Sequence, residues 1–348
     1  MTLGVPSQSI IAPMSIAAFA TIVSWTAIFL MLPTLRQSAL AHPVARSSHR
    51  IPTPQGAGTG IAIATAIAAS AFFMVSFGEE SGFHPHVVIL ALSLAAMVLT
   101  GLLDDIQGLS VRIRLAIQFA SAAAIITSLP TEIAVLPEGL PRLVERIIEI
   151  GALLTFMNLV NFIDGLDEIS IAHGAPAIAG VTIIAVVGSL PGWIMPLSAA
   201  ALGALIGFWP WNRHVAKIFL GDSGSLPLGL LLGYLMIVLA GTGYWSSAAL
   251  LCLYPLTDGA WTLFDRWRRG QNLTEGHRDH CYQRATSRGL AVTTVSRTVL
   301  ALSCILALLA QVLSAHAPLW QHVAMAALGL GLTAVTLRWF ATGGARPL

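Results

Sequence analysis

Gly101-Leu102-Leu103-Asp104-Asp105 is the stretch that decides the fold of this chain. It ends an apolar run that begins near Val87, and a run of this length predicts a helix that spans a membrane. Two adjacent carboxylates at the end of a hydrocarbon segment repel each other, which costs free energy unless a cation, a basic partner or a bound substrate lies beside them. By itself, the pair is equally consistent with a polar stop and helix cap at the membrane surface.

Composition excludes a soluble globular domain. Of the 348 residues, 56% are hydrophobic and 10% are charged, and the mean hydropathy is +0.79. A net charge of +2 is too small to indicate a nucleic-acid partner. Cys252, Cys281 and Cys304 have no paired spacing, so they indicate neither a disulfide framework nor a metal knuckle.

Apolar segments of about 20 residues recur along the chain and predict an all-α polytopic membrane protein of about eleven spans. No basic residue precedes Arg36, so the first segment lacks the charged start of a cleaved signal peptide and is expected to remain as a span. Because no internal repeat or linker is visible, we expect one membrane domain over residues 1–348. The expected spans are 10–33, 57–77, 86–103, 114–130, 143–162, 169–188, 194–211, 223–241, 246–264, 293–313 and 320–338.

Charge distribution predicts the orientation. All Lys and Arg residues except Arg142 and Arg146 fall after odd-numbered spans, so the positive-inside rule predicts a periplasmic N-terminus and a cytoplasmic C-terminus. Every Asp residue falls in or near the cytoplasmic half, whereas most Glu residues lie on the other side. Solvated loops use both acids, so this asymmetry favours a metal or phosphate site facing the cytoplasm. The loops expected to form it are about 36–56, 104–113, 161–168, 212–225 and 265–292.

The first two of these loops combine basic residues with turns. Arg50 precedes Pro52-Thr53-Pro54, whose extended turn would let backbone amides approach an anion, although an ordinary Pro/Gly connection explains it as well. Arg114 begins the fourth span, where its guanidinium could balance Asp104 and Asp105 or bind a phosphate.

The third loop is the most specific. Asn158 and Asn161 are three residues apart and share a helix face, which Asp164 continues. Gly165 is expected to break the helix and turn Asp167 toward the same place. Four polar groups that face one way at a membrane boundary are poorly explained by helix capping alone.

The remaining candidates lie in the last two loops and the ninth span. Asp222, flanked by glycines at a helix N-terminus, is a candidate metal ligand beside an anion-binding turn, or else a helix cap. His277, Arg278 and His280 are candidates for binding a pyrophosphate; with Cys281 they would make an incomplete zinc set. Asp258, inside an expected span, is either functional or hydrogen-bonded to a neighbouring helix.

These segments, in this order, resemble the polyprenyl-phosphate N-acetylhexosamine-1-phosphate transferases, a family that includes the MraY and WecA branches. The resemblance rests on the Pro-Thr-Pro loop, the Asp-Asp pair, the Asn-x-x-Asn-x-x-Asp-Gly-x-Asp segment, Gly-Asp-x-Gly-Ser and the final loop. It implies an enzyme of the bacterial inner membrane that uses Mg²⁺, with Mn²⁺ as an alternative. The implied reaction transfers N-acetylhexosamine-1-phosphate from a UDP-sugar to undecaprenyl phosphate and releases UMP. A homodimer is compatible with it.

The resemblance also implies roles for individual residues. Asp222 is the first choice for Mg²⁺, with Asp105 near it, and Asp104 would orient or deprotonate the lipid phosphate. The residues expected to be catalytic are Asp104, Asp105, Asp164 and Asp222, and Asp164 would hold nucleotide and metal together with Asn161 and Asp167. The residues expected to bind the substrates are Arg50, Arg114, Asn158, Asn161, Asp167, His277, Arg278 and His280. The chain departs from the family pattern at Glu168, where Gly is usual, and at Arg114, where many members have Lys.

The final loop, His277-Arg278-Asp279-His280-Cys281-Tyr282-Gln283-Arg284, favours the WecA- and WbpL-type branch that initiates O-antigen and related polysaccharides. The peptidoglycan pentapeptide transferase is the alternative within the family. A secondary transporter is the alternative from another class; transporters place charges near the bilayer midplane and show inverted repeats, which this sequence does not.

Overall fold

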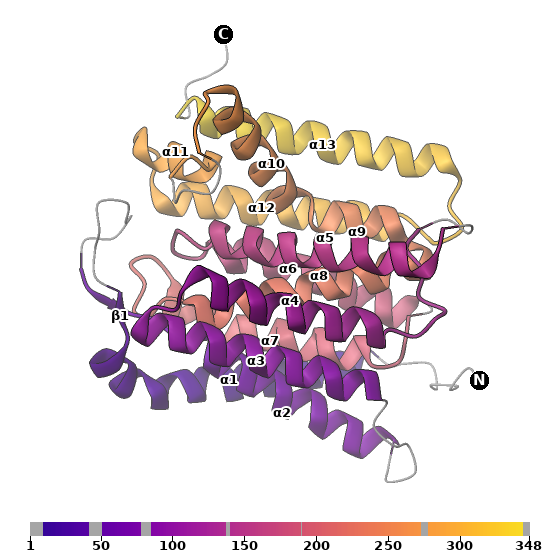
Figure 1. Cartoon of the computed structure of the whole chain (residues 1–348), viewed down its shortest axis with the longest axis horizontal. Helices are drawn as coiled ribbons and strands as arrows, with labels where there is room; N and C mark the ends of the chain where they lie inside the picture. The colour runs from indigo at the N-terminus through magenta and orange to yellow at the C-terminus, as the bar shows by residue number, and fades with distance from the viewer. Residues whose placement is uncertain are drawn as a thin grey trace.

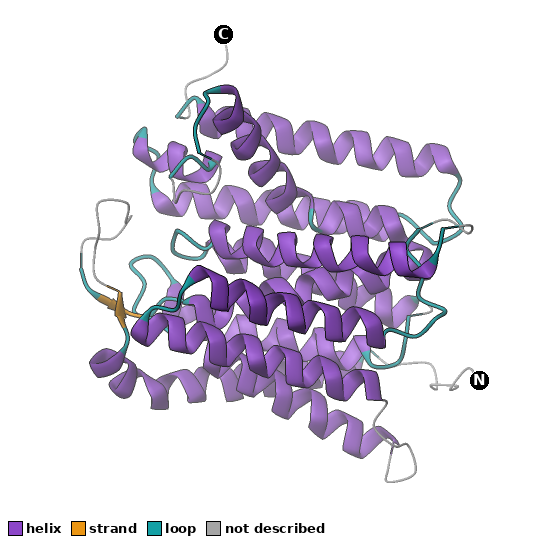
Figure 2. Ribbon diagram, viewed as in Figure 1, coloured by secondary structure: helices purple, strands orange, loops and turns teal. Residues whose placement is uncertain are grey.

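The computed structural model describes residues 10–41, 51–77, 85–136, 140–188, 190–272 and 278–343. Long helices run side by side through the molecule, and the only sheet in the described residues has two short strands (Figure 1, Figure 2). The helices are α1 (Ile11–Ser38), α2 (Gly58–Phe77), α3 (Pro85–Gln107), α4 (Val111–Ser128), α5 (Arg142–Ile163), α6 (Ile169–Val187), α7 (Ile194–Asn212), α8 (Asp222–Leu239), η1 (Ala240–Tyr244), α9 (Trp245–Leu251), α10 (Leu253–Arg268), α11 (Cys281–Ser287), α12 (Val292–Gln311) and α13 (Leu319–Ala341). The strands β1 (Leu40–Ala41) and β2 (Thr53–Pro54) pair antiparallel.

The prediction of an all-α polytopic membrane protein is confirmed. Among the described residues, eight helical segments are long and apolar enough to cross a membrane, and the described apolar part of α2, Gly58–Met74, is shorter. Helices occur at each of the expected spans. The number of spans that cross, and the side on which each end lies, stay predictions.

One expected span is not a single helix. The segment predicted as one span over 246–264 is divided into α9 and α10, which are separated at Cys252. Pro255 explains the break, because its ring would clash with the carbonyl four residues earlier, that of Leu251, where α9 ends. The division lets α10 leave the direction of α9, so that it runs toward the end of the bundle that carries α11 (Figure 1).

Helix α8 lies in the middle of the bundle and is buried along nearly its whole length. It packs against α2, α3, α5 and α6. Its first residue, Asp222, lies at the end of the bundle where α3 meets α4, α5 meets α6 and α7 meets α8 (Figure 1). β1, α11 and the last turn of α13 lie at this same end. The motif-bearing loops therefore gather at one end, as the sequence predicted.

Candidate active site

Two close helix contacts bring the Asp104–Asp105 pair to the start of α8. A Cβ atom on Gly101 would lie 2.2 Å from the carbonyl carbon of Asp222, and one on Gly58 would lie 2.0 Å from the Cα of Gly224. Any larger residue at these positions would force α3 or α2 away from α8. The glycines therefore determine that residues more than 100 positions apart in the sequence share one site.

Asp105 caps helix α8 from a different helix. Its Oδ1 accepts a hydrogen bond from the backbone N–H of Asp222 at 2.9 Å, and its Oδ2 accepts one from Ser223 at 3.1 Å. Gly221 makes this approach possible, because it has φ +73° and a Cβ there would lie 2.5 Å from the Asp105 carboxylate. A carboxylate at a helix N-terminus is stabilised by the free N–H groups and the helix dipole.

Arg114 joins the two halves of the site. Its Nη1 donates to Asp104 Oδ2 at 2.6 Å and to Asp222 Oδ2 at 2.8 Å. The other oxygen of Asp104 accepts from the backbone N–H of Leu109 at 2.6 Å. One guanidinium thus offsets the repulsion between two carboxylates, while Asp105 adds a third carboxylate close by. Unless carboxylates are protonated, this group keeps a net negative charge.

Asn161 completes the contacts of Asp222. Its amide donates to Asp222 Oδ1 and to Ser225 Oγ, both at 2.8 Å. Asn158, one turn earlier, instead donates to Gln118 Oε1 of α4 at 2.8 Å. We name Asp104, Asp105, Arg114, Asn161 and Asp222 the carboxylate cluster.

Asp164 and Asp167 contact groups outside this cluster. Asp164 accepts a hydrogen bond from the Ser170 hydroxyl at 2.6 Å. Burial, together with the nearby Asp105 and Asp167 carboxylates, raises the pKa of Asp164 to about 7, although the Ser170 hydrogen bond lowers it. Asp164 is therefore poised to change its charge near neutral pH when a cation or phosphate arrives.

Asp167 makes its contacts at the α7–α8 loop, and its charge still acts on Asp164. Its Oδ2 lies 2.7 Å from Nδ1 of His214 and accepts from the N–H of Ala216 at 3.2 Å, so its contacts are with the α7–α8 loop. Gly165 also makes room for a neighbouring helix. A Cβ there would lie 2.4 Å from the hydroxyl of Tyr282, which donates to the Phe162 carbonyl at 3.0 Å. Gly165 thus admits α11 to the α5–α6 turn.

The final loop is attached to α10 through a buried carboxylate. Asp258, fully buried, accepts from the N–H of Cys281 at 2.9 Å, and its Oδ1 lies 3.5 Å from His280 Nδ1. The His280 ring is also buried and stacks on Tyr282. Asp258 therefore makes a structural contact with α11, and His280 faces this contact. Arg278 is described, but Arg50 and His277 lie outside the described residues.

The cluster has the type of donor atom that a divalent cation prefers. Its oxygen donors are those that Mg²⁺ prefers, and the Arg114 Nη1 between two of its carboxylates shows where a positive charge is accommodated. In the described ranges, no three His, Cys, Asp or Glu side chains are grouped so that they could hold a metal ion. Both Asp105 oxygens accept backbone hydrogen bonds, so the assignment of Asp105 and Asp222 to the metal stays a prediction.

Sequence reasoning did not single out four residues that support this site. They are Gln118, Ser170, His214 and Ser225, which bind Asn158, Asp164, Asp167 and Asn161 respectively. Ser225 and Gln118 lie in segments that were predicted to be functional because of Asp222 and Arg114. Ser170 and His214 carried no pattern, because their partners are determined by how the loops pack.

Glu168 shows why a Gly would be favourable at its position. It has φ +67°, the left-handed region, at the N-terminus of α6. Its N–H donates to Asn212 Oδ1 at 2.7 Å, and its carboxylate accepts from the Trp209 indole at 2.8 Å. These contacts hold a residue that is strained by roughly 1–2 kcal/mol in this conformation.

We predict that Glu168→Gly is more stable than Glu168→Ala by about 1 kcal/mol, because both variants lose the Trp209 contact and only Ala keeps the backbone strain. Thermal melting of the purified protein in detergent measures the difference, which corresponds to about 2 °C for a chain of this size. Equal melting temperatures would show that position 168 is not held in the left-handed region.

A family model and several curated relatives match this chain. The family model described as "Glycosyl transferase family 4" matches residues 86–240, which contain every member of the carboxylate cluster. The chain is 30% identical over 226 residues to a decaprenyl-phosphate N-acetylglucosaminephosphotransferase of Mycolicibacterium smegmatis, covering 60% of this chain and 55% of the relative. It is 26% identical over 297 residues to a probable undecaprenyl-phosphate N-acetylglucosaminyl 1-phosphate transferase of Bacillus subtilis, covering 78% of each chain.

A third relative belongs to another branch. The phospho-N-acetylmuramoyl-pentapeptide-transferase of Aliarcobacter butzleri is 32% identical over 179 residues, which cover 42% of this chain and 51% of the relative. The chain thus spans about half the length of several curated relatives that it matches. All three relatives are named as transferases, and the family model covers the helices that build the site. Residues 86–240 of the chain, which carry the carboxylate cluster, match glycosyl transferase family 4.

Proposed function

We propose that this protein transfers N-acetylhexosamine-1-phosphate from a UDP-N-acetylhexosamine to undecaprenyl phosphate, producing undecaprenyl-diphosphate-N-acetylhexosamine and UMP. The observation that carries the proposal is the carboxylate cluster at one end of a membrane bundle, where Arg114 bridges Asp104 and Asp222. The names of the mycobacterial and Bacillus relatives support a sugar-1-phosphate transfer to a polyprenyl phosphate.

The reaction requires two anions to meet at a membrane surface. An oxygen of the lipid phosphate forms a bond to the sugar-bearing phosphorus of the donor. The bond from this phosphorus to the bridging oxygen breaks, and its electron pair leaves with UMP. Fixed positive groups must offset the repulsion of the reactants and the charge of the leaving group.

The cluster offers a group for each of these tasks. Arg114 would contact a phosphate oxygen while it stays paired with Asp104, and Asn161 holds the Asp222 carboxylate in one orientation. Asp104 would orient the lipid phosphate or accept its proton; a phosphate with a second pKa of about 6 is already mostly dianionic at neutral pH. Asp222, with Asp105 beside it, would hold Mg²⁺, which neutralises phosphate charge when bound.

The proposal extends to the cellular setting. The charge distribution supports a bacterial inner-membrane location with the cluster facing the cytoplasm. The form of the final loop supports the initiating step of O-antigen or related surface polysaccharides. The Aliarcobacter relative favours the second candidate, the pentapeptide transferase of peptidoglycan synthesis. The two candidates differ in the donor that they accept.

The test is UMP release by the purified protein with undecaprenyl phosphate, Mg²⁺ and a panel of UDP-N-acetylhexosamines that includes UDP-N-acetylmuramoyl-pentapeptide. We expect release with an N-acetylhexosamine donor that depends on both lipid and metal. Asp222→Asn should reduce it by at least about 100-fold, because the charge that faces Arg114 and the metal is lost. Glu132→Gln, an exposed acid between α4 and α5, is the matched control and should remain active.

The donor that supports UMP release decides between the two candidate functions. Release with only the pentapeptide donor would replace the first candidate by the second. No release with any donor from folded protein, or full activity of Asp222→Asn, would contradict the proposal. The transporter alternative would then be tested by uptake into vesicles.

A further inference from the structure

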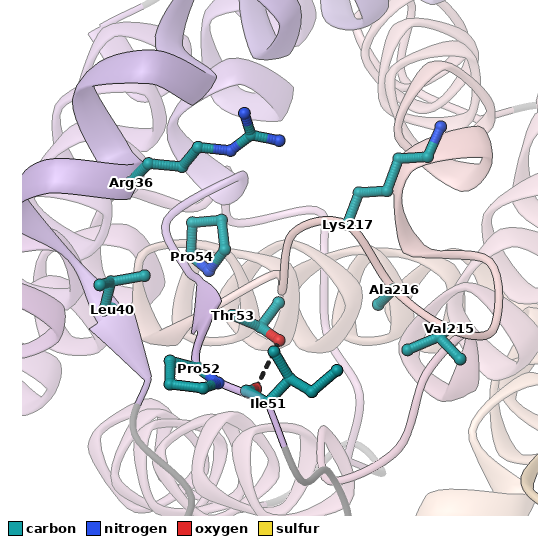
Figure 3. Close-up of a pocket in the computed structure, with 9 residues that line it drawn as sticks. All are labelled: Arg36, Leu40, Ile51, Pro52, Thr53, Pro54, Val215, Ala216 and Lys217. Carbon is teal, nitrogen blue, oxygen red and sulfur yellow. Dashed lines mark hydrogen bonds between the residues drawn. The ribbon is translucent and has the colours of Figure 1, made fainter.

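A pocket separate from the carboxylate cluster lies beside the end of α1 (Figure 3). Its volume is about 420 Å³, and it lies between α1, the β1–β2 strands and the α7–α8 loop. Its walls include Pro52, Pro54, Val215 and Ala216, and its charged lining residues are Arg36 and Lys217.

The charge in this pocket has one sign. Arg36 and Lys217 come from opposite sides of the pocket (Figure 3), and both are exposed. Within the described part of the chain, neither makes an ion pair, and no Asp or Glu lines the pocket. Two cations that face one cavity without a carboxylate repel each other and favour an anionic ligand.

Aromatic residues connect this pocket to the membrane-facing surface. The Lys217 ammonium lies 5.8 Å from the centre of the Trp211 ring. Trp211 contacts Trp25 and Phe29 of α1 at 5.5 and 6.3 Å between ring centres. Trp25 is 44% and Phe29 is 53% exposed, on a helix apolar enough to span a membrane. Trp25 and Phe29 lie at and just past the middle of this 28-residue helix, so their exposed faces offer apolar surface to an acyl chain.

The position of the pocket along α1 is the one expected for a lipid headgroup. Arg36 follows Phe29 by seven residues, which is about 10 Å along a helix. Arg36 is in the last turn of α1, beyond the exposed aromatic residues, where a span of this length would reach the phosphates of a bilayer. On its other side, the 215–217 segment is tied to Asp167 by the N–H of Ala216, so the wall of the pocket is fixed.

We propose that this pocket binds the phosphate of an anionic phospholipid from the leaflet on the side of the carboxylate cluster. The phosphate would lie between Arg36 and Lys217, with an acyl chain along Trp25 and Phe29. No residue of the carboxylate cluster lines this pocket, so the proposal can be tested apart from the reaction.

Lipid binding to the purified full chain, stripped of lipid in neutral detergent, tests the proposal. Phosphatidylglycerol and phosphatidylcholine are compared by native mass spectrometry, each titrated over the same range. We expect the protein to bind phosphatidylglycerol at least about tenfold more tightly, and R36Q/K217Q to lose this preference. Arg338→Gln removes an exposed arginine near the end of α13 and should keep it.

Two further variants and one competitor distinguish the outcomes. Lys217→Arg keeps the positive charge and should keep the preference for phosphatidylglycerol. Thermal melting reports whether R36Q/K217Q is folded. If that variant does not fold, the single Lys217→Gln replaces it, with a smaller loss expected. Unchanged preference in a folded variant, or equal binding of both lipids by the natural chain, overturns the proposal. Displacement of phosphatidylglycerol by millimolar inorganic phosphate would also overturn it, because the pocket would then be a site for free phosphate.

Discussion

Arg114→Met is expected to lower kcat/KM for UMP release by at least about 100-fold, equivalent to about 2.7 kcal/mol of transition-state stabilisation. A single nitrogen of Arg114 holds both Asp104 and Asp222, at 2.6 and 2.8 Å. Methionine fills a similar volume without charge, so the two carboxylates would repel each other and no fixed cation would meet the phosphates. Initial rates over a range of donor and lipid concentrations measure the effect.

Two further variants show whether the loss comes from the Arg114 bridge itself. Arg112→Met removes an exposed arginine on the same helix, two residues away, and should leave kcat/KM within about twofold. Arg114→Lys should retain much of the activity, because an ammonium can also donate to both carboxylates and many family members are expected to have Lys there. Equal losses in Arg112→Met and Arg114→Met would mean that general surface charge, rather than the bridge, supports the reaction.

The sequence predicted the helices well because apolar length is a local property. The run that ends at Leu103 predicted a span over 86–103, and the structure has α3 over Pro85–Gln107. It also predicted which loops would meet, since charge asymmetry assigns them to one side of a membrane. Asp104, Asp105, Asn161 and Asp222 were all candidates before their contacts were known.

The partners of these residues were not predictable, because they depend on packing between distant helices. Asp105 caps α8 only because Gly101 lets α3 approach Asp222 to within backbone contact. The contact of Asp167 with His214 and that of Gly165 with Tyr282 of α11 join segments far apart in the sequence, so no local pattern predicted them. The break at Cys252 carried one local signal, Pro255, within a segment otherwise apolar enough to be assigned as a single span.

Asp258→Leu is expected to lower the melting temperature by roughly 5 °C and to detach the final loop from α10. The side chain is fully buried and accepts the N–H of Cys281 at 2.9 Å. Leucine leaves this buried donor without a partner, which costs about 1–3 kcal/mol, and removes the neighbour of His280. Asp258→Asn keeps an oxygen that can accept the same hydrogen bond, so its loss should be smaller.

The detachment can be measured separately from stability by limited proteolysis with trypsin below the melting temperature. Cleavage after Arg284, which now pairs with Asp265 at 2.5 Å, should accelerate in Asp258→Leu because α11 opens more often. Thr257→Val is the matched control, since its hydroxyl bonds only to Leu253 of the same helix in the described contacts. If Asp258→Leu melted and was cleaved like the natural chain, Asp258 would not hold α11. The buried carboxylate would then need a functional explanation, because no contact would remain to offset the cost of burying it.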